Sequence, residues 1–297
     1  MDALKQLLEY ILTPSGEIFV VGALIVLIVP ILVHFYVVHT TPYTSLPSIL
    51  LAGPPGGGKT ALLALLERGG DRPPATHTSQ APQSVELTVS ADRGAATFRE
   101  AARADAPGAH RKFLLVDTPG HGKLRRHAAD HLAAAGPALR GVVFVVDAAA
   151  LDDGDESPDG SAPGGLADAA AYLYDLLLAL QRRTAAGRTS KTPDAVHVLV
   201  AANKLDLFTA LPAALVRARL EAELGHLRQT RSRGLLGSGV GADEVGAEEH
   251  DVWLGQYGSE KFAFGQMREF DVEVDVVGGS VLDGKVDKWW DWISERI

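Results

Sequence analysis

Residues Gly53 to Thr60 read GPPGGGKT, which fits the pattern G-x-x-x-x-G-K-[ST] of a loop that wraps its backbone around phosphate groups. Glycine permits close backbone approach, so the N–H groups from Gly56 through Thr60 can point at a β-phosphate. The Lys59 ammonium would bridge the β- and γ-phosphates, and the Thr60 hydroxyl would bind Mg²⁺. The residues predicted to hold the phosphates are Gly53, Gly56, Gly57, Gly58, Lys59 and Thr60.

A second motif, Asn203-Lys204-Leu205-Asp206, follows the apolar stretch Val196–Ala201. A carboxylate at Asp206 can accept hydrogen bonds from N1–H and the 2-amino group of guanine, whereas adenine presents a lone pair at N1. Polar groups left unpaired in this way change affinity by a factor of roughly 10⁴. The motif therefore predicts GTP with Mg²⁺ as the ligand, and an ATPase is the alternative if the motif is accidental.

Between these motifs lies Asp117-Thr118-Pro119-Gly120-His121, at the end of another apolar stretch. Asp117 would contact Mg²⁺ through water, and the Gly120 N–H can reach a γ-phosphate, so the segment would sense whether that phosphate is present. His121 stands where a side chain could orient an attacking water. An exposed helix-capping histidine without a chemical role is the other interpretation of His121, and the sequence leaves both open.

Composition excludes several classes of function. The chain has 297 residues and a formal net charge of −9, and no basic face dominates it, which argues against direct nucleic-acid binding. It contains no cysteine, which excludes disulfides, thiolate metal sites and cysteine nucleophiles.

The segment from Ile18 to Val38 contains no Asp, Glu, Lys or Arg. As a helix it would be roughly 31 Å long, the thickness of a bilayer's hydrocarbon core. We therefore expect a short N-terminal segment (1–17), a transmembrane helix (18–38), a linker (39–47) and a folded domain (48–297). A cleaved signal peptide lacks support because the start is acidic, and a buried helix apolar on all faces is rare at this length. The flanks are too poor in Lys and Arg to fix the orientation.

Short apolar strands alternate with longer helices in the rest of the chain, which predicts an α/β fold with a doubly wound, mostly parallel six-stranded sheet. The expected strands are Ser48–Ala52, Val85–Ser90, Lys112–Asp117, Val142–Asp147, Val196–Ala201 and Val272–Val277. The expected helices are Lys59–Glu67, His121–Ala135, Ala167–Arg183, Pro212–Leu227 and Asp283–Glu295.

Two stretches interrupt this alternation, Asp152–Gly165 and Arg231–Glu249. Their acidic, Gly-rich or aperiodic composition predicts flexible inserts. Arg228, Arg231 and Arg233 are expected to be solvated in or beside the second insert, with a contact to lipid headgroups as the alternative.

The three motifs, in this order and spacing, resemble those of small GTPases within the P-loop NTPase fold. Within that group, the N-terminal apolar segment, the acidic start and THTS at Thr76–Ser79 are similar to the family of signal recognition particle receptor beta subunits. The resemblance implies that Thr78 coordinates Mg²⁺ in the GTP-bound state, with Thr76 as the competing choice. It also implies that Ser280 contacts guanine, although the preceding Gly278 and Gly279 depart from the usual pattern.

The resemblance further implies a single-pass protein of the endoplasmic reticulum membrane, with a cytosolic GTPase domain and slow GTP hydrolysis. Its switch segments would bind the N-terminal domain of the receptor's alpha subunit when GTP is bound, and the ribosome or translocon would be further contacts. An Arf- or Sar-like GTPase that recruits coat proteins is the alternative. Residue 2 is Asp2, so the myristoylation signal of many such proteins is missing.

Overall fold

The structure is a computed structural model that describes residues 16–40, 46–90, 110–151, 164–186, 195–237, 253–255, 259 and 261–297. The chain divides into two compact units, Met1–Ser45 and Leu46–Ile297. Most of the insert expected at 152–165, and the insert expected at 231–249 beyond residue 237, lie outside the described residues.

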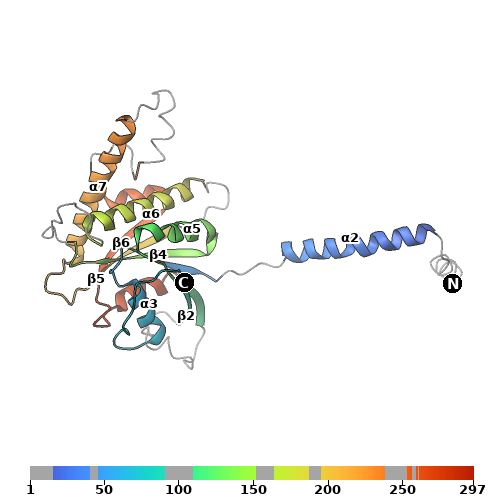
Figure 1. Ribbon diagram of the computed structural model, residues 1–297, viewed down its shortest axis with the longest axis horizontal. Helices are drawn as coiled ribbons and strands as arrows, with labels where there is room; N and C mark the ends of the chain where they lie inside the picture. Colours follow the sequence, from blue (N-terminus) through green and yellow to red (C-terminus); the bar gives the residue numbers. More distant parts are fainter. Residues whose placement is uncertain are drawn as a thin grey trace. The chain divides into compact units, whose positions relative to one another are not determined.

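The first unit contains helix α2 (Gly16–Thr40), which continues through Pro30 (Figure 1). Val20 and the side chains from Gly22 to Tyr36 are exposed. Within the described part of the chain, no helix satisfies the combination of length and hydropathy that a membrane span requires.

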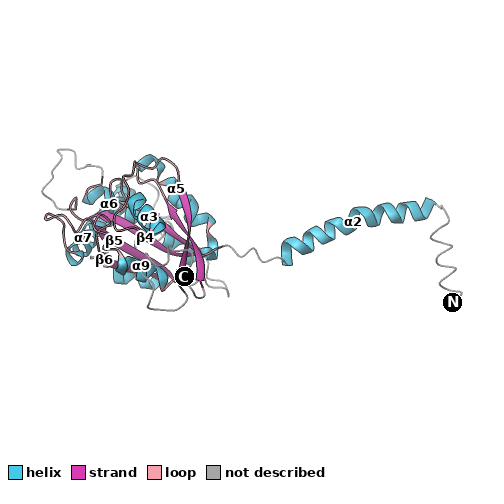
Figure 2. Ribbon diagram, turned by 90° about the horizontal axis from the view of Figure 1, so that it is seen from below, coloured by secondary structure: helices cyan, strands magenta, loops and turns pink. Residues whose placement is uncertain are grey.

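The second unit is built on a six-stranded sheet, as the sequence predicts (Figures 1 and 2). Its spatial order is β2-β3-β1-β4-β5-β6, and only β2 runs antiparallel to its neighbour. The carboxyl ends of the five parallel strands therefore meet at one edge, where ligands bind in open α/β sheets. The strands are β1 (Ser48–Ala52), β2 (Gln83–Ser90), β3 (His110–Asp117), β4 (Leu139–Asp147), β5 (Val196–Asn203) and β6 (Val272–Gly278).

Helices cover both faces of the sheet (Figure 2). One face packs an apolar core against α5, α6 and α7, and the other packs a separate core against α3 and α9. Because the central strands β1, β4 and β5 are buried on both sides, they consist of nearly continuous apolar residues, whereas the edge strand β2 is partly exposed and more polar. The helices are α3 (Lys59–Arg68), α5 (Arg126–Ala134), α6 (Leu166–Ala186), α7 (Ala213–Gly237) and α9 (Asp287–Ser294), with shorter 3₁₀ helices η1 (Gly122–Leu124), η2 (Gly136–Ala138) and η3 (Phe264–Phe270).

Three helices differ most from those expected. The helix expected from His121 to Ala135 is divided into η1 and α5. The helix expected from Asp283 begins at Asp287, because Ser280 and Lys285 form a β-bridge that closes the preceding loop. The helix expected to end at Leu227 continues to Gly237, so the prediction of a loop from Arg231 onward is wrong for residues 231–237.

The prediction that Arg228 is solvated is also wrong, since its side chain is only 1% exposed. Its guanidinium donates to the carbonyl of Leu254 (3.3 Å) and to that of Ser259, and it lies 4.5 Å from the ring centroid of Trp253. A buried cation needs such partners because desolvation is costly. Arg228 thereby fixes a segment distant in sequence against α7. Arg231 is more exposed and pairs with Asp175 at 2.7 Å.

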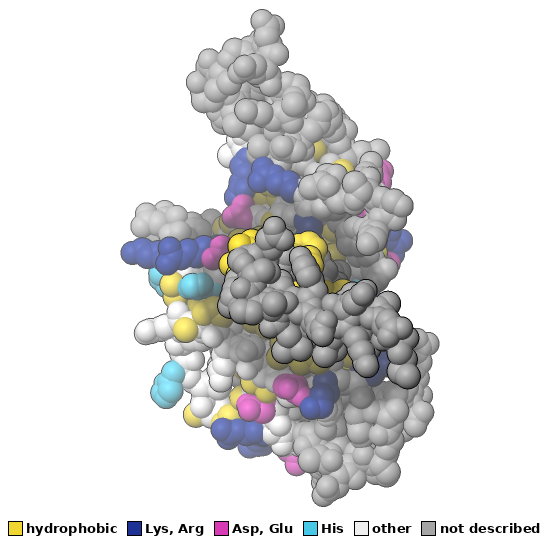
Figure 3. Space-filling view, turned by 90° about the vertical axis from the view of Figure 1, so that its right-hand side faces the viewer, with side chains coloured by type: hydrophobic (Ala, Val, Ile, Leu, Met, Phe, Trp, Pro, Cys, Tyr) yellow, Lys and Arg dark blue, Asp and Glu magenta, His cyan; other side chains and the backbone are white. Residues whose placement is uncertain are grey.

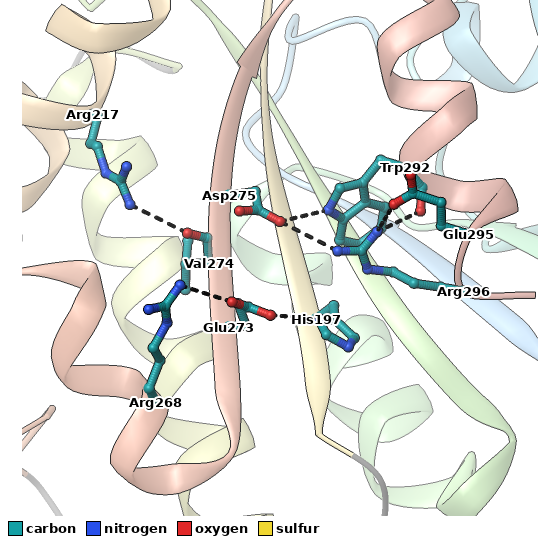
Figure 4. Close-up of polar contacts among 9 residues, drawn as sticks. All are labelled: His197, Arg217, Arg268, Glu273, Val274, Asp275, Trp292, Glu295 and Arg296. Carbon is teal, nitrogen blue, oxygen red and sulfur yellow. Dashed lines mark hydrogen bonds and ion pairs between the residues drawn. The ribbon is translucent and has the colours of Figure 1, made fainter.

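A polar cluster joins the amino-terminal halves of β5 and β6 to the end of α9 (Figure 4). Asp275 accepts from the Trp292 indole (2.9 Å) and from Arg296 (3.4 Å). Glu273 lies 3.3 Å from the His197 imidazole, whose pKa is lowered by its burial. These contacts fix α9 on the sheet, and α9 in turn supports the loop that follows β6. On the face drawn in Figure 3, basic and acidic side chains lie interspersed.

Candidate nucleotide-binding site

The phosphate-loop motif forms the turn between β1 and α3, as predicted. Gly53, Gly56 and Gly58 have φ angles of 134°, 76° and 100°, which side chains rarely allow. A Cβ on Gly53 would lie 2.2 Å from the Val145 carbonyl oxygen, and one on Gly58 would lie 2.3 Å from the Asn203 amide nitrogen. The glycines are thus required by the turn and by its contacts with β4 and β5.

Lys59 occupies the centre of this loop and is only 5% exposed. Its ammonium donates to the carbonyl oxygens of Gly53 (2.9 Å) and Pro54 (2.8 Å). Burial lowers the pKa of Lys59 to about 8, and the nearby Asp117 offsets part of this effect. The ammonium is therefore placed in the loop but only weakly stabilised in its charged form, and an anionic phosphate would stabilise it.

Thr60 and Asp117 meet at the start of α3 and the end of β3. The Thr60 hydroxyl donates to Asp117 Oδ2 at 2.6 Å. Asp117 is fully buried, burial raises the pKa of its carboxyl group, and its Oδ1 has no hydrogen-bond partner among the described residues. Oxygen atoms of this kind suit Mg²⁺, which keeps several waters and phosphate oxygens as its other ligands. In the part of the chain that the structure describes, no group of three or more His, Cys, Asp or Glu is placed so that it could hold a metal ion by itself.

A cavity of about 190 Å³ opens beside the phosphate loop. Two segments from elsewhere in the chain line it: Gly120, and the stretch from Thr76 to Ser79. Both Thr76 and Thr78 belong to the lining, so the choice of Thr78 as the magnesium ligand stays a prediction. We call residues 76–79 the first switch and residues 120–125 the second switch.

The second switch packs closely on the phosphate loop. A Cβ on Gly120 would lie 2.6 Å from Lys59 Nζ and 2.7 Å from the Gly53 carbonyl oxygen. His121, by contrast, is exposed, and its Nδ1 accepts from the Lys123 N–H (3.3 Å) at the start of η1. This is the capping geometry of the non-catalytic interpretation, and the catalytic role of His121 stays a prediction.

The side-chain amide of Asn203, 3% exposed at the end of β5, connects three loops. Its nitrogen donates to the Gly57 carbonyl (2.8 Å), and its oxygen accepts from the Val281 N–H (3.0 Å). The next residue, Lys204, has a left-handed φ of 65° and pairs with Asp147 at 2.5 Å. Sequence reasoning missed Asp147, although its place at the carboxyl end of an apolar strand was a usable signal.

Asp206 lies beside the loop after β6, as the base-reading prediction requires. Its Oδ1 accepts from the Ser280 hydroxyl at 2.6 Å. Both residues line a cavity of about 350 Å³ whose floor includes Gly278 and Gly279. A Cβ on Gly279 would lie 2.7 Å from the Trp289 ring, so packing of α9 under this loop explains that glycine. The structure thus brings the predicted phosphate and base residues to the same sheet edge.

The sequence matches that of one protein family over most of its length. The profile of the family described as "Signal recognition particle receptor beta subunit" matches residues 44–270. The signal recognition particle receptor subunit beta of Saccharomyces cerevisiae is 30% identical over 255 residues, which is 84% of each chain.

Solved structures agree with this assignment. The structure titled "Signal recognition particle receptor SRb-GTP/SRX complex from Chaetomium thermophilum" is 40% identical, with a TM-score of 0.69, and covers 84% of this chain and 100% of that one. A second structure from the same organism, titled SRb-GDP-Mg, is 42% identical with a TM-score of 0.60 and covers 86% and 100%.

The lowered pKa of Lys59 predicts that GTP affinity depends on pH. In the free protein the pKa of Lys59 is about 8. A bound triphosphate must raise this pKa, so binding above pH 8 requires Lys59 to take up a proton. The affinity should then fall by up to about tenfold per pH unit above 8 and be nearly constant between about 7 and 7.5. Titration calorimetry with GTP and Mg²⁺ at pH 7 to about 8.8, below the range in which the guanine N1–H itself ionises, in buffers of different ionisation enthalpy, measures both effects.

Lys59→Arg is the control, because arginine keeps its proton over this range. Any residual binding by this variant should lose the dependence. Equal affinities of the unsubstituted chain at pH 7 and about pH 8.8 would contradict the account of Lys59.

Proposed function

Because the chain belongs to the family of signal recognition particle receptor beta subunits, we propose that it is anchored in the endoplasmic reticulum membrane and holds the receptor's alpha subunit there when GTP is bound. The GTPase subunit of this receptor serves co-translational protein targeting. The observation that carries the proposal is the likeness to the complex of SRb-GTP with SRX, which this chain matches over that structure's full length. The family assignment replaces the alternatives of a coat-recruiting Arf- or Sar-like GTPase and of an ATPase.

In the proposed complex, GTP lies along the carboxyl edge of the sheet. Backbone N–H groups of residues 56–60 would surround the β-phosphate, and Lys59 would exchange its two carbonyl partners for phosphate oxygens. Thr60, water on Asp117, and the threonine of the first switch would hold Mg²⁺. Two observations support this arrangement: Asp117 Oδ1 has no hydrogen-bond partner among the described residues, and the threonines line the cavity beside the phosphate loop.

We infer that Asp206 reads the guanine edge and that Ser280 orients its carboxylate. The Ser280 hydroxyl donates to one oxygen of Asp206 and itself accepts from the Asp283 N–H (3.1 Å). That arrangement leaves Asp206 Oδ2 and a second lone pair on Oδ1 for the two guanine donors. Lys204, held through Asp147, would place its apolar stem beside the ring.

Partner binding would depend on the γ-phosphate through the two switches. That phosphate would engage the threonine of the first switch through Mg²⁺ and the Gly120 N–H of the second switch directly. A surface made of both switches would then be ordered only with GTP, and the N-terminal domain of the alpha subunit would bind there. Slow hydrolysis is in keeping with His121, whose Nδ1 caps η1.

The membrane anchor rests on the uncharged sequence from Ile18 to Val38 and on the exposed apolar side chains of α2. Segment 39–47 is short, so the GTPase domain would remain near the bilayer on the cytosolic side. The tether would raise the effective concentration of a bound partner at the membrane. Contacts with the ribosome or translocon remain expectations from the family resemblance.

A flotation experiment tests the tether. The full chain is reconstituted in liposomes and mixed with the purified N-terminal domain of the alpha subunit. We expect this domain to float with the liposomes when Mg²⁺ and a non-hydrolysable GTP analogue are present, and to stay at the bottom with GDP. The unit Leu46–Ile297 should bind the domain without floating, and Thr60→Asn should abolish capture because Mg²⁺ is lost. Flotation of the shortened unit would disprove the anchor, and nucleotide-independent capture would disprove the switch.

Base reading is tested by Asp206→Asn. An amide can donate to the 2-oxygen of xanthine and no longer matches the guanine edge, so GTP affinity should fall by about 10²-fold or more while XTP affinity rises. Competition of both nucleotides against a fluorescent analogue measures this. Asp283→Asn, whose side chain pairs with Lys285 at 2.9 Å beside the same cavity, is the matched control and should keep guanine preference. Unchanged preference in Asp206→Asn would remove Asp206 from the base site.

A further inference from the structure

Arg125 connects the second switch to a helix that none of the nucleotide motifs include. Its guanidinium forms an ion pair with Asp168 in the first turn of α6, at 2.5 Å between Nη2 and Oδ1. Its Nε donates to the Gly120 carbonyl at 3.4 Å. The side chains of Arg125 and Asp168 are 19% and 26% exposed, so the pair is largely shielded from water. A shielded, charge-assisted pair fixes geometry better than a surface ion pair.

Arg125 lies over a buried aromatic side chain. The guanidinium carbon lies 4.6 Å from the ring centroid of Tyr172, a residue of α6 that is only 3% exposed. That ring in turn packs edge-on against Phe144 of β4, with 5.5 Å between centroids. Arg125 therefore has one arrangement in which the ion pair, the carbonyl contact and the stacking occur together.

Asp168 also reaches toward the phosphate loop. Its second oxygen accepts from the Gly164 N–H at 3.2 Å. Gly164 has a left-handed φ of 92°, and a Cβ there would lie 2.9 Å from the Pro55 carbonyl oxygen. Asp168 thus holds one segment lying on the phosphate loop and, through Arg125, a second segment lying on the same loop.

We propose that Arg125 and Asp168 are positioning residues that hold Gly120 against the phosphate loop and thereby make the site select GTP over GDP. Gly120 already packs within van der Waals reach of Lys59 and Gly53, which is where an N–H directed at a γ-phosphate has to be. The inference rests on the proposed role of Gly120. Preorganisation of this N–H strengthens binding only of a ligand that uses it, and GDP has no γ-phosphate.

The ion pair should therefore affect the affinity for GTP and not the affinity for GDP. Without the Arg125–Asp168 pair, the second switch would have to become ordered when GTP binds, which lowers GTP affinity, whereas GDP would bind as before. The effect is reciprocal. If GTP raises the affinity for a partner that binds the second switch held by Arg125, that partner must raise the affinity for GTP by the same factor.

The test compares dissociation constants of GTP and GDP, each with Mg²⁺, for the full chain in detergent, by competition with a fluorescent analogue. Asp168→Asn removes the charge but keeps an oxygen that can accept from Gly164. We expect it to weaken GTP by about 5-fold or more and GDP by less than about twofold. Arg125→Gln should weaken GTP at least as much, because it also removes the contact with the Gly120 carbonyl, and the double variant should be no worse than Arg125→Gln alone, because the ion pair is already lost.

Asp175→Asn is the matched control on the same helix. Asp175 pairs with Arg231 at 2.7 Å but is 59% exposed and far along α6 from the second switch, so the GTP/GDP ratio should not change. Equal weakening of both nucleotides by Asp168→Asn would mean that the pair only stabilises the fold and would overturn the proposal, as would an unchanged ratio or additive effects in the double variant. The unsubstituted chain separates the two levels of inference. If it binds GTP no more tightly than GDP, the assumed contact of Gly120 with the γ-phosphate has failed; if it prefers GTP and Asp168→Asn keeps that preference, only the role of the Arg125–Asp168 pair has failed.

Discussion

The side-chain amide of Asn203 is the contact on which the site most depends. It bonds the phosphate loop at Gly57 and the loop after β6 at Val281, while its own backbone ends β5. Both bonds are buried, and a buried amide is stable only when donor and acceptor are both satisfied. The distance between the phosphate site and the base site is therefore set by one side chain. The motif from Asn203 to Asp206, which the sequence predicts to bind the base, therefore also holds the phosphate loop in place.

The parallel sheet makes this contact possible, and the charged residues at the same edge of the sheet favour a bound nucleotide. Five parallel strands deliver their carboxyl ends to one edge, so residues far apart in sequence become neighbours. Burial of Lys59 and Asp117 at this edge shifts the pKa of each against its charged form. An anionic phosphate beside Lys59 and a cation beside Asp117 would stabilise those charged forms. Arg125 and Asp168 extend the same logic to the second switch. The ligand thus supplies interactions that the protein arranges but does not itself complete.

Much of this could be predicted from the sequence, because the phosphate loop, the segment at Asp117 and the motif at Asn203 each follow a strand with a fixed local pattern. The sheet and its mostly parallel pairing followed from the alternation of apolar segments. What failed depends on contacts between distant residues. Arg228 looks solvated by composition, yet Trp253 and Leu254 bury it, and this packing accompanies the extension of α7 to Gly237. The Arg125–Asp168 pair joins residues on either side of the insert expected at 152–165, and neither residue type at its position carries a signal. Gly279 is explained only by its neighbours in the fold, since a Cβ placed there would lie 2.7 Å from both the Lys285 carbonyl oxygen and the Trp289 ring.

The central claim, that one amide holds the phosphate and base loops in register, is tested most directly by the dissociation rates of GTP and GDP from Asn203→Ala in the full chain. Loss of two buried hydrogen bonds should cost about 2–4 kcal/mol and accelerate release of both nucleotides by about 30-fold or more, because both use the phosphate loop and the base loops. Far-ultraviolet circular dichroism should show the sheet intact. Release of either nucleotide at the rate of the unsubstituted chain would contradict the account.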